Sequence, residues 1–276
     1  MEPKQIELRQ VRDFGAIIGI TFEFIRQNFM LLFKSSLYIA GPFIFLAGIF
    51  LGLYQSAILN LRNVRTMNSI GWPFFLYVLF AMVAALMLYS IVYNFVLLYE
   101  ERGFGNFDIN DIWEKVKSNF WMIFFTGIGY AFFVLLGSVF LIIPGVYLAV
   151  TLSLIFIIRL REGLSFFAAF DRCTKLISQN WWFTFGLILV VGLIQGFIGF
   201  IFYLPSYIAM VAMVFSGMNN PNQQSSGNII FIITSVIASL SFLLYTISVI
   251  AVSFHYFNLV ERKEAPSLIA KIDSIE

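Results

Sequence analysis

The sequence has little of what soluble proteins use for surfaces and for chemistry. Charged residues make up only 12% of its 276 residues, whereas a soluble domain carries about 25%. It contains one cysteine, Cys173, and one histidine, His255, which cannot build a disulfide framework or, by themselves, a metal cluster. The net charge of +2 gives no reason to expect a nucleic-acid partner. These deficits exclude an ordinary soluble protein, and we expect no cofactor and no metal.

What the sequence has in abundance is long apolar runs. Hydrophobic residues make up 60% of the chain and aromatic residues 18%. A spanning helix needs roughly 20 apolar residues to cross a core about 30 Å thick. Six runs meet this need, at about 30–54, 72–98, 120–142, 145–160, 181–204 and 228–257. The sequence therefore predicts an all-α, polytopic integral membrane protein with six transmembrane helices in a single membrane domain, 1–276.

The charges predict the orientation of these helices. All fifteen acidic residues and fifteen of the seventeen basic residues fall on the side of the two termini, which leaves Arg62 and Arg65 on the other side. Basic residues concentrate on the cytoplasmic side of membrane proteins. We therefore expect a multi-pass protein of the cytoplasmic membrane with its N- and C-termini in the cytoplasm.

The six helices also read as three repeated hairpins, at about 12–103, 108–163 and 164–264. Similar strings precede the odd-numbered helices, namely IRQNF at 25–29, VKSNF at 116–120 and ISQNW at 177–181. The even-numbered helices end alike, in YEERG at 99–103, LREG at 160–163 and VERKE at 260–264. Pro144 and Pro205 lie at the same offset from Asn119 and Asn180, so both predict a turn at the outer end of a hairpin.

Each repeat begins with an amphipathic stretch. In 164–179, Phe166, Phe170, Cys173 and Ile177 share one helical face, while Arg172 and Lys175 lie on the other. This pattern predicts interfacial helices with their apolar side in the acyl boundary and Arg172 and Lys175 toward cytoplasmic lipid or a partner. Residues 265–276 read as a short amphipathic cytoplasmic tail.

One part of the chain resembles a known family. Residues 144–193 combine a Pro-Gly turn, a helix ending at Glu162 and Gly163, a short helix FFAAFDRCTKLI and an Asn-Trp pair before the next span. This pattern is similar to the integral-membrane domain of some bacterial glycerophosphodiester phosphodiesterases and of stand-alone relatives. The resemblance implies a bacterial inner-membrane location. The phosphodiesterase barrel has no room in this chain, so the activity is not implied.

Few polar residues lie inside the expected spans. Gln195, Asn94 and His255 are the candidate intramembrane polar contacts, for which a substrate contact and an interhelical hydrogen bond are the alternatives. Asn28, Asn119 and Asn180 stand where an in-plane helix meets a span, and we expect them to be structural hinges that cap the spanning helix. Gly48/Gly52 and Gly192/Gly196, with Ser235/Ser239, predict close helix packing, within the chain or between chains.

No acid, base and nucleophile cluster, phosphate loop or HExxH pattern is present, so we expect no catalytic residues. The leading hypothesis is a non-enzymatic membrane scaffold or accessory subunit that engages membrane lipid or a protein partner through its cytoplasmic face. A homo-oligomer is a further alternative for the partner. The alternative is a transporter or channel for a small neutral or amphipathic, lipid-derived molecule.

Overall fold

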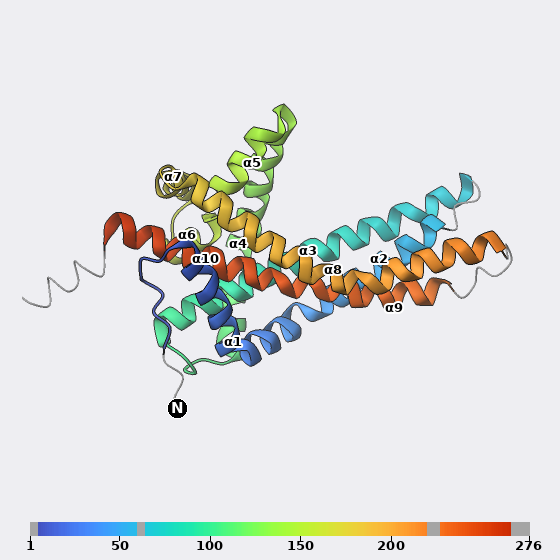
Figure 1. Cartoon of the computed structure of the whole chain (residues 1–276), viewed down its shortest axis with the longest axis horizontal. Coiled ribbons are helices and arrows are strands. Elements are labelled where there is room, and N and C mark those ends of the chain that lie inside the picture. The colour runs from blue at the N-terminus through green and yellow to red at the C-terminus, as the bar shows by residue number, and fades with distance from the viewer. Residues whose placement is uncertain (1–4, 60–63, 220–226, 266–276) are drawn as a thin grey trace, which may run out of the picture. The chain divides into compact units, whose positions relative to one another are not determined.

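The computed structural model describes residues 5–59, 64–219 and 227–265. This part of the chain consists of helices joined by short turns, and no strand occurs in it (Figure 1). In chain order the helices are α1 (Phe14–Ile39), α2 (Gly41–Leu59), α3 (Val64–Arg102), α4 (Ile109–Phe140), α5 (Ile142–Thr151), α6 (Ile155–Glu162), α7 (Phe166–Ile177), α8 (Trp181–Asn219), α9 (Gly227–Ser239), the 3₁₀ helix η2 (Leu240–Leu244) and α10 (Tyr245–Glu264).

The described chain has seven helical stretches that are long and apolar enough to cross a membrane. They are Phe14–Ile39, Gly41–Ile58, Ile70–Arg102, Ile109–Val139, Ile142–Glu162, Trp181–Phe215 and Ile229–Glu264. These helices are consistent with the expected polytopic all-α membrane protein. The predicted count of six and the threefold repeat are not confirmed.

The extra stretch arises near the N-terminus, where one in-plane helix and one span at 30–54 were expected. Instead, α1 runs to Ile39, and α2 starts at Gly41 after a turn at Ala40. Pro42 has no N–H to donate to the preceding turn. The carbonyl of Ala40 accepts instead from the amides of Phe43 and Ile44, at 3.1 and 3.0 Å. The chain therefore divides at this point into two helices.

The hinge and turn predictions hold only in part. Asn28 lies within α1 and Asn119 within α4, so neither begins a helix; α4 begins instead at a capping box of Asp108 and Asp111. Asn180 does stand between α7 and α8. Helix α8 continues through Pro205 to Asn219, so the turn expected at this proline does not occur. Transmembrane helices tolerate such internal prolines.

Two compact units make up the chain, and the core of the first is aromatic. Unit 1 comprises Met1–Ser35, Tyr89–Leu193 and Thr246–Glu276, and unit 2 comprises Ser36–Leu88 and Ile194–Tyr245. In unit 1, Phe24 of α1 makes edge contacts with Phe95, Tyr99 and Phe254, at centroid distances of 6.0, 4.8 and 5.5 Å, and all four are buried. Edge-to-face pairs of this kind stabilise by about 0.5–1.5 kcal/mol beyond the area they bury. They join α1, α3 and α10.

Helices α4 and α5 of unit 1 form a hairpin at Leu141, whose backbone is extended (φ −164°, ψ 152°). A Cβ on Gly137 would come within 3.2 Å of the backbone of Gly145, so the two glycines let the helices approach closely. Pro144 lies in the first turn of α5, where its missing N–H leaves no hydrogen bond unmade. The turn expected at Pro144-Gly145 is therefore three residues earlier.

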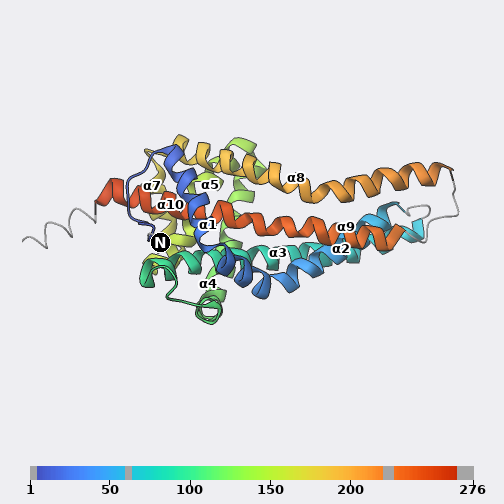
Figure 2. The ribbon, with the colours of Figure 1, turned by 60° about the horizontal axis from the view of Figure 1, so that its bottom comes forward.

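Unit 2 is built around the α2–α9 contact, which is visible as two adjacent helices in Figure 2. A Cβ on Gly48 would lie 2.6 Å from the Cα of Val236, and a Cβ on Gly52 would lie 2.5 Å from the Cα of Ile232. Ser235 donates a 3.0 Å hydrogen bond to Gln55 across the same seam. The Gly48/Gly52 and Ser235/Ser239 pattern thus packs within the chain. A Cβ on Gly192 or Gly196 would instead meet nothing within 4 Å among the described residues.

Candidate functional site

Several ionisable side chains of unit 1 meet where α3, α6 and α10 end. Glu100, the third residue from the end of α3, accepts hydrogen bonds from Arg9 at 2.8 and 3.0 Å and from Arg161 of α6 at 2.8 and 3.0 Å. Glu100 and Arg161 are only 16% and 20% exposed. Bidentate Arg–carboxylate pairs are among the stronger hydrogen bonds in proteins. Glu100 therefore ties the N-terminal segment and α6 to the end of α3.

The network continues from Arg161 through Tyr256 of α10. Arg161 donates to the hydroxyl of Tyr256 at 3.0 Å, and this hydroxyl donates to Glu162 at 2.7 Å. Arg172 of α7 pairs with Glu162 at 3.0 Å and also with Glu264. The guanidinium of Arg161 lies 5.5 and 4.9 Å from the ring centroids of Tyr256 and Phe257. We call this network, comprising Arg9, Glu100, Arg161, Tyr256, Glu162, Arg172 and Glu264, the charged end.

Residues 5–13 form an extended segment that lies on the charged end. Alternate side chains point inward, so Ile6 and Leu8 are buried while Glu7 is exposed. The amide of Ile6 donates to the hydroxyl of Tyr99 at 2.9 Å. The amide of Arg12 donates to the side chain of Asn258 at 2.9 Å. These contacts hold the segment on α3 and α10 without regular secondary structure.

The Arg12 side chain turns back along this segment. Its guanidinium donates to the carbonyls of Glu7 and Leu8, and it lies 5.5 Å from the ring centroid of Phe254. Burial lowers the pKa of Arg12 from its ordinary value, and the nearby Glu7 opposes that shift. Arg12 remains cationic at neutral pH because its ordinary pKa is so high.

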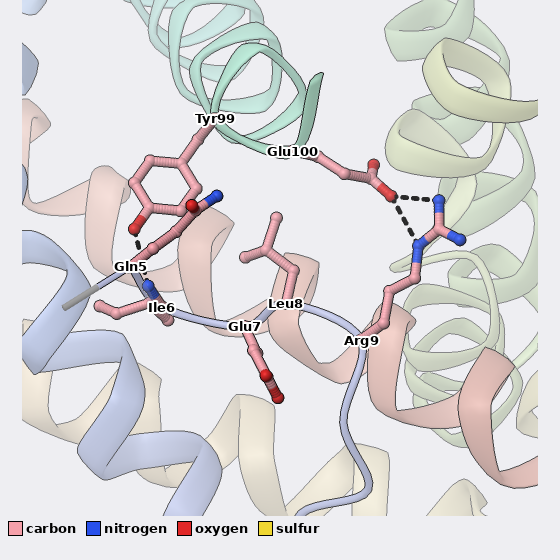
Figure 3. A pocket seen from close by; sticks show the side chains of 7 residues that line it. All are labelled: Gln5, Ile6, Glu7, Leu8, Arg9, Tyr99 and Glu100. Carbon is pink, nitrogen blue, oxygen red and sulfur yellow. Dashed lines mark hydrogen bonds and ion pairs between the residues drawn. The ribbon is translucent and has the colours of Figure 1, made fainter. Parts of the chain in front are cut away.

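A pocket of about 410 Å³ lies between this segment and the end of α3. It is lined by Gln5, Ile6, Glu7, Leu8, Arg9, Tyr99 and Glu100. Figure 3 shows Arg9 reaching to Glu100 and Glu7 pointing away from it. The volume is near the lower end for small-molecule sites. The seven lining residues include two carboxylates but no serine, threonine, cysteine or histidine, so they offer hydrogen bonds and charge rather than a nucleophile.

Two of the polar residues singled out from the sequence, Asn94 and Asn119, come together in the structure. The side chain of Asn119 on α4 donates to the side-chain oxygen of Asn94 on α3 at 2.9 Å. Asn94 is 1% exposed and donates in turn to the carbonyl of Ser90 at 2.8 Å. Asn119 is therefore an interhelical contact rather than a cap.

His255 and Asn180 are linked through Thr184. The hydroxyl of Thr184 donates to the carbonyl of Asn180 at 2.9 Å, and it lies 2.8 Å from Nε2 of His255. A hydroxyl has one proton, so with that proton on the Asn180 carbonyl the second bond takes Nε2 of the buried His255 as its donor. The ring of His255 also stacks on Phe183 at 5.3 Å. The histidine is thus a buried packing residue that joins α10 to α8 through Thr184.

The other predicted polar residues have local roles. The side chain of Asn28 donates to the carbonyl of Phe24 one turn earlier in α1, at 2.9 Å, and is buried. Gln195 is half-buried on α8 and makes contacts of its own.

The apolar face of helix α7 was expected to lie in the acyl boundary, and the structure shows protein against it. Its apolar face packs on protein: Cys173 and Ile177 are buried, and Phe166 and Phe170 contact Phe133 of α4, at 5.9 and 5.3 Å. Burial raises the pKa of the Cys173 thiol well above its ordinary value, which is typical of an inert buried cysteine.

The predicted cytoplasmic face at Arg172 and Lys175 is divided between two roles. The hydrogen bond to Glu264 and the nearby Glu162 raise the pKa of Arg172, although partial burial opposes this. Arg172 therefore belongs to the charged end. The prediction that it lies on an open face for lipid or a partner is wrong, because Glu162 and Glu264 bind it. Lys175 is exposed on α7.

The sequence analysis missed the main members of the charged end, Glu100, Arg161 and Tyr256. A signal was present, because Glu100, Glu162 and Glu264 belong to the three similar strings that end the even-numbered helices. Within the described ranges, no group of three or more His, Cys, Asp and Glu side chains could hold a metal ion. Comparisons with protein families, curated proteins and solved structures find no match to this chain.

Proposed function

We propose that this chain is a non-enzymatic scaffold or accessory subunit of a membrane. The observation that carries this proposal is the mutual neutralisation of the charged end. Its carboxylates and guanidiniums bind one another, and they join the N-terminal segment, α3, α6, α7 and α10. Groups held in this way build a rigid surface, whereas a catalytic acid or base must be free to reach a substrate.

The intramembrane polar residues support the same proposal over transport. Asn94 binds Asn119, and His255 binds Thr184. Polar side chains that bind one another between helices stabilise packing. A transport path would need such groups to face a water-filled cavity.

The location belongs to the proposal as well. We infer a bacterial cytoplasmic membrane with both termini in the cytoplasm, because of the charge split and of the resemblance at residues 144–193. In a Cys173→Ser background, Gln223→Cys should react with an impermeant thiol reagent added from outside, and Ser267→Cys should not. The reverse pattern would overturn this orientation.

The scaffold role is tested by a paired experiment. The Lys175→Glu variant should lose a stoichiometric partner subunit that the wild-type and Lys175→Arg proteins retain on native mass spectrometry from mildly solubilised membranes. Lys175 is chosen because it is exposed, while changing Arg172 would also break its pairs with Glu162 and Glu264. In proteoliposomes, the wild-type protein should show no solute flux above empty vesicles. A solute flux in the wild-type protein that the Gln195→Leu variant lacks would overturn the scaffold proposal in favour of a transporter.

A further inference from the structure

One face of α4 presents a regular row of exposed side chains. Trp113, Lys117, Trp121 and Phe125 follow one another at intervals of four residues, and side chains so spaced lie on one face of a helix. All four are exposed, with the tryptophans at 37% and 64% and Phe125 at 59%. We call Trp113, Lys117 and Trp121 the tryptophan–lysine row.

The opposite face of α4 fixes the direction of this row. Ile112, Val116 and Ile123 are buried, and Asn119 binds Asn94 of α3. The helix therefore cannot rotate the row inward without exposing its packed face and breaking that bond. The row stays on the surface of unit 1.

The length of the apolar part of this face matches a bilayer. Beyond Trp121, the exposed residues on α4 include Ile128, Phe132, Leu135 and Val139, and none of these is charged. The distance along the helix from Trp121 to Val139 is ~27 Å at 1.5 Å per residue, close to the hydrocarbon thickness of about 30 Å. If this face spans the core, Lys117 lies about one turn outside it, at the level of the lipid phosphates.

Lys117 also differs from Lys115, the other lysine of α4, in its partners. Five cations of unit 1 are paired with carboxylates: Arg9, Arg102, Lys115, Arg161 and Arg172. None of the ion pairs of the described residues includes Lys117. Its ammonium lies 5.7 Å from the ring centroid of Trp113 instead.

We propose that the tryptophan–lysine row binds the headgroup of an anionic phospholipid. Lys117 supplies the charge that complements the phosphate, and Trp113 and Trp121 flank it with the amphipathic rings that favour this depth of the bilayer. This inference rests on the proposed membrane scaffold and identifies a lipid contact that the sequence analysis had placed at Arg172 and Lys175.

The test is a titration of the purified full chain in neutral detergent, with lipid binding counted by native mass spectrometry. Lys117→Gln should bind phosphatidylglycerol roughly fivefold more weakly than wild type, since one basic residue near anionic lipid contributes about that factor. Its binding of phosphatidylcholine should be unchanged, and Lys117→Arg should behave like wild type. Lys115→Gln is the matched control. It removes the same charge two residues from Lys117, and Lys115 is already paired with Glu101.

Two outcomes would overturn the proposal. One is unchanged phosphatidylglycerol binding by Lys117→Gln; the other is an equal loss in Lys117→Gln and Lys115→Gln, which would show a diffuse charge effect. Should Lys117→Gln keep its lipid but lose the partner subunit, the row binds protein, so this inference fails while the proposed function stands. Should the partner be absent from every preparation while the lipid selectivity follows Lys117, the scaffold role fails and the lipid site stands.

Discussion

Unit 1 and unit 2 differ in which contacts do most to hold their helices together. Every acidic residue of the chain, the histidine and all basic residues except Arg62 and Arg65 belong to unit 1. Its helices are joined by ion pairs at the charged end and by amide and hydroxyl pairs. In unit 2, α2 and α9 are instead brought to backbone contact at Gly48 and Gly52. Lipid tails are as apolar as leucine, so helices in a membrane associate through close packing and through hydrogen bonds between polar groups, the two kinds of contact seen here.

The difference predicts where each unit is vulnerable. A helix contact that depends on glycines is destabilised when a side chain is added there, because the facing backbone atoms cannot move aside. A network of charges fails when one member is removed, because its partners are then left buried and unpaired.

The largest effect should come from filling the seam of unit 2. Gly52→Leu places a side chain where a Cβ already lies 2.5 Å from the backbone of Ile232, so we expect a loss of about 3 kcal/mol of unfolding free energy. Gly196→Ala is the control, since a Cβ there meets nothing within 4 Å. Its stability in detergent should not fall. An equal loss in the two variants would show that helix propensity, not the seam, is being measured.

The next largest effect should come from removing Glu100 of unit 1. Glu100→Ala leaves Arg9 and Arg161 without their carboxylate, and we expect a loss of about 2–3 kcal/mol, below the range for fully buried pairs. Amide hydrogen exchange in residues 5–13 should increase. The adjacent Glu101→Ala breaks only an exposed pair with Lys115 and should change stability by about 0–1 kcal/mol. Similar losses at both positions would argue against a special role for the charged end.

The sequence predicted the class of fold well because apolar length and charge distribution are local properties. It predicted the close packing at Gly48 and Gly52 for the same reason. It did not predict that Asn119 meets Asn94, or that Arg161 joins Glu100 to Tyr256. Those pairings depend on how helices distant in sequence pack, which no local pattern specifies.

The repeats show how local similarity can mislead. Pro144 and Pro205 stand in similar strings, yet one lies in the first turn of a helix and the other in a helix interior. The structural consequence of a proline depends on whether other groups can satisfy the carbonyl that its missing N–H leaves without a donor. Near the N-terminus, Pro42 lies in the first turn of α2, and the run at 30–54 that was expected to form one span is divided between α1 and α2.

A smaller effect is expected at the hydroxyl that joins His255 to Asn180. Thr184→Val keeps the side-chain shape but removes the acceptor of the His255 Nε2–H, so we expect a loss of about 1 kcal/mol. Thr184→Ser should restore it. Nitrogen-15 chemical shifts of the wild-type imidazole should report a proton on Nε2. A proton on Nδ1 would show that the hydroxyl donates to the ring and not to the carbonyl of Asn180.

The smallest expected effect is the coupling between Asn94 and Asn119, and it tests whether unit 1 relies on polar pairs away from its charged end. Single hydrogen bonds between membrane helices contribute on average about 0.6 kcal/mol. A double-mutant cycle with Asn94→Ala and Asn119→Ala should give a coupling of that size, because the two side chains bind each other at 2.9 Å. Asn119→Asp should not restore the bond, since a carboxylate cannot donate to the oxygen of Asn94. A helix cap would tolerate aspartate well. Full stability in Asn119→Asp, with no coupling in the cycle, would therefore show that the bond between Asn94 and Asn119 does not stabilise unit 1.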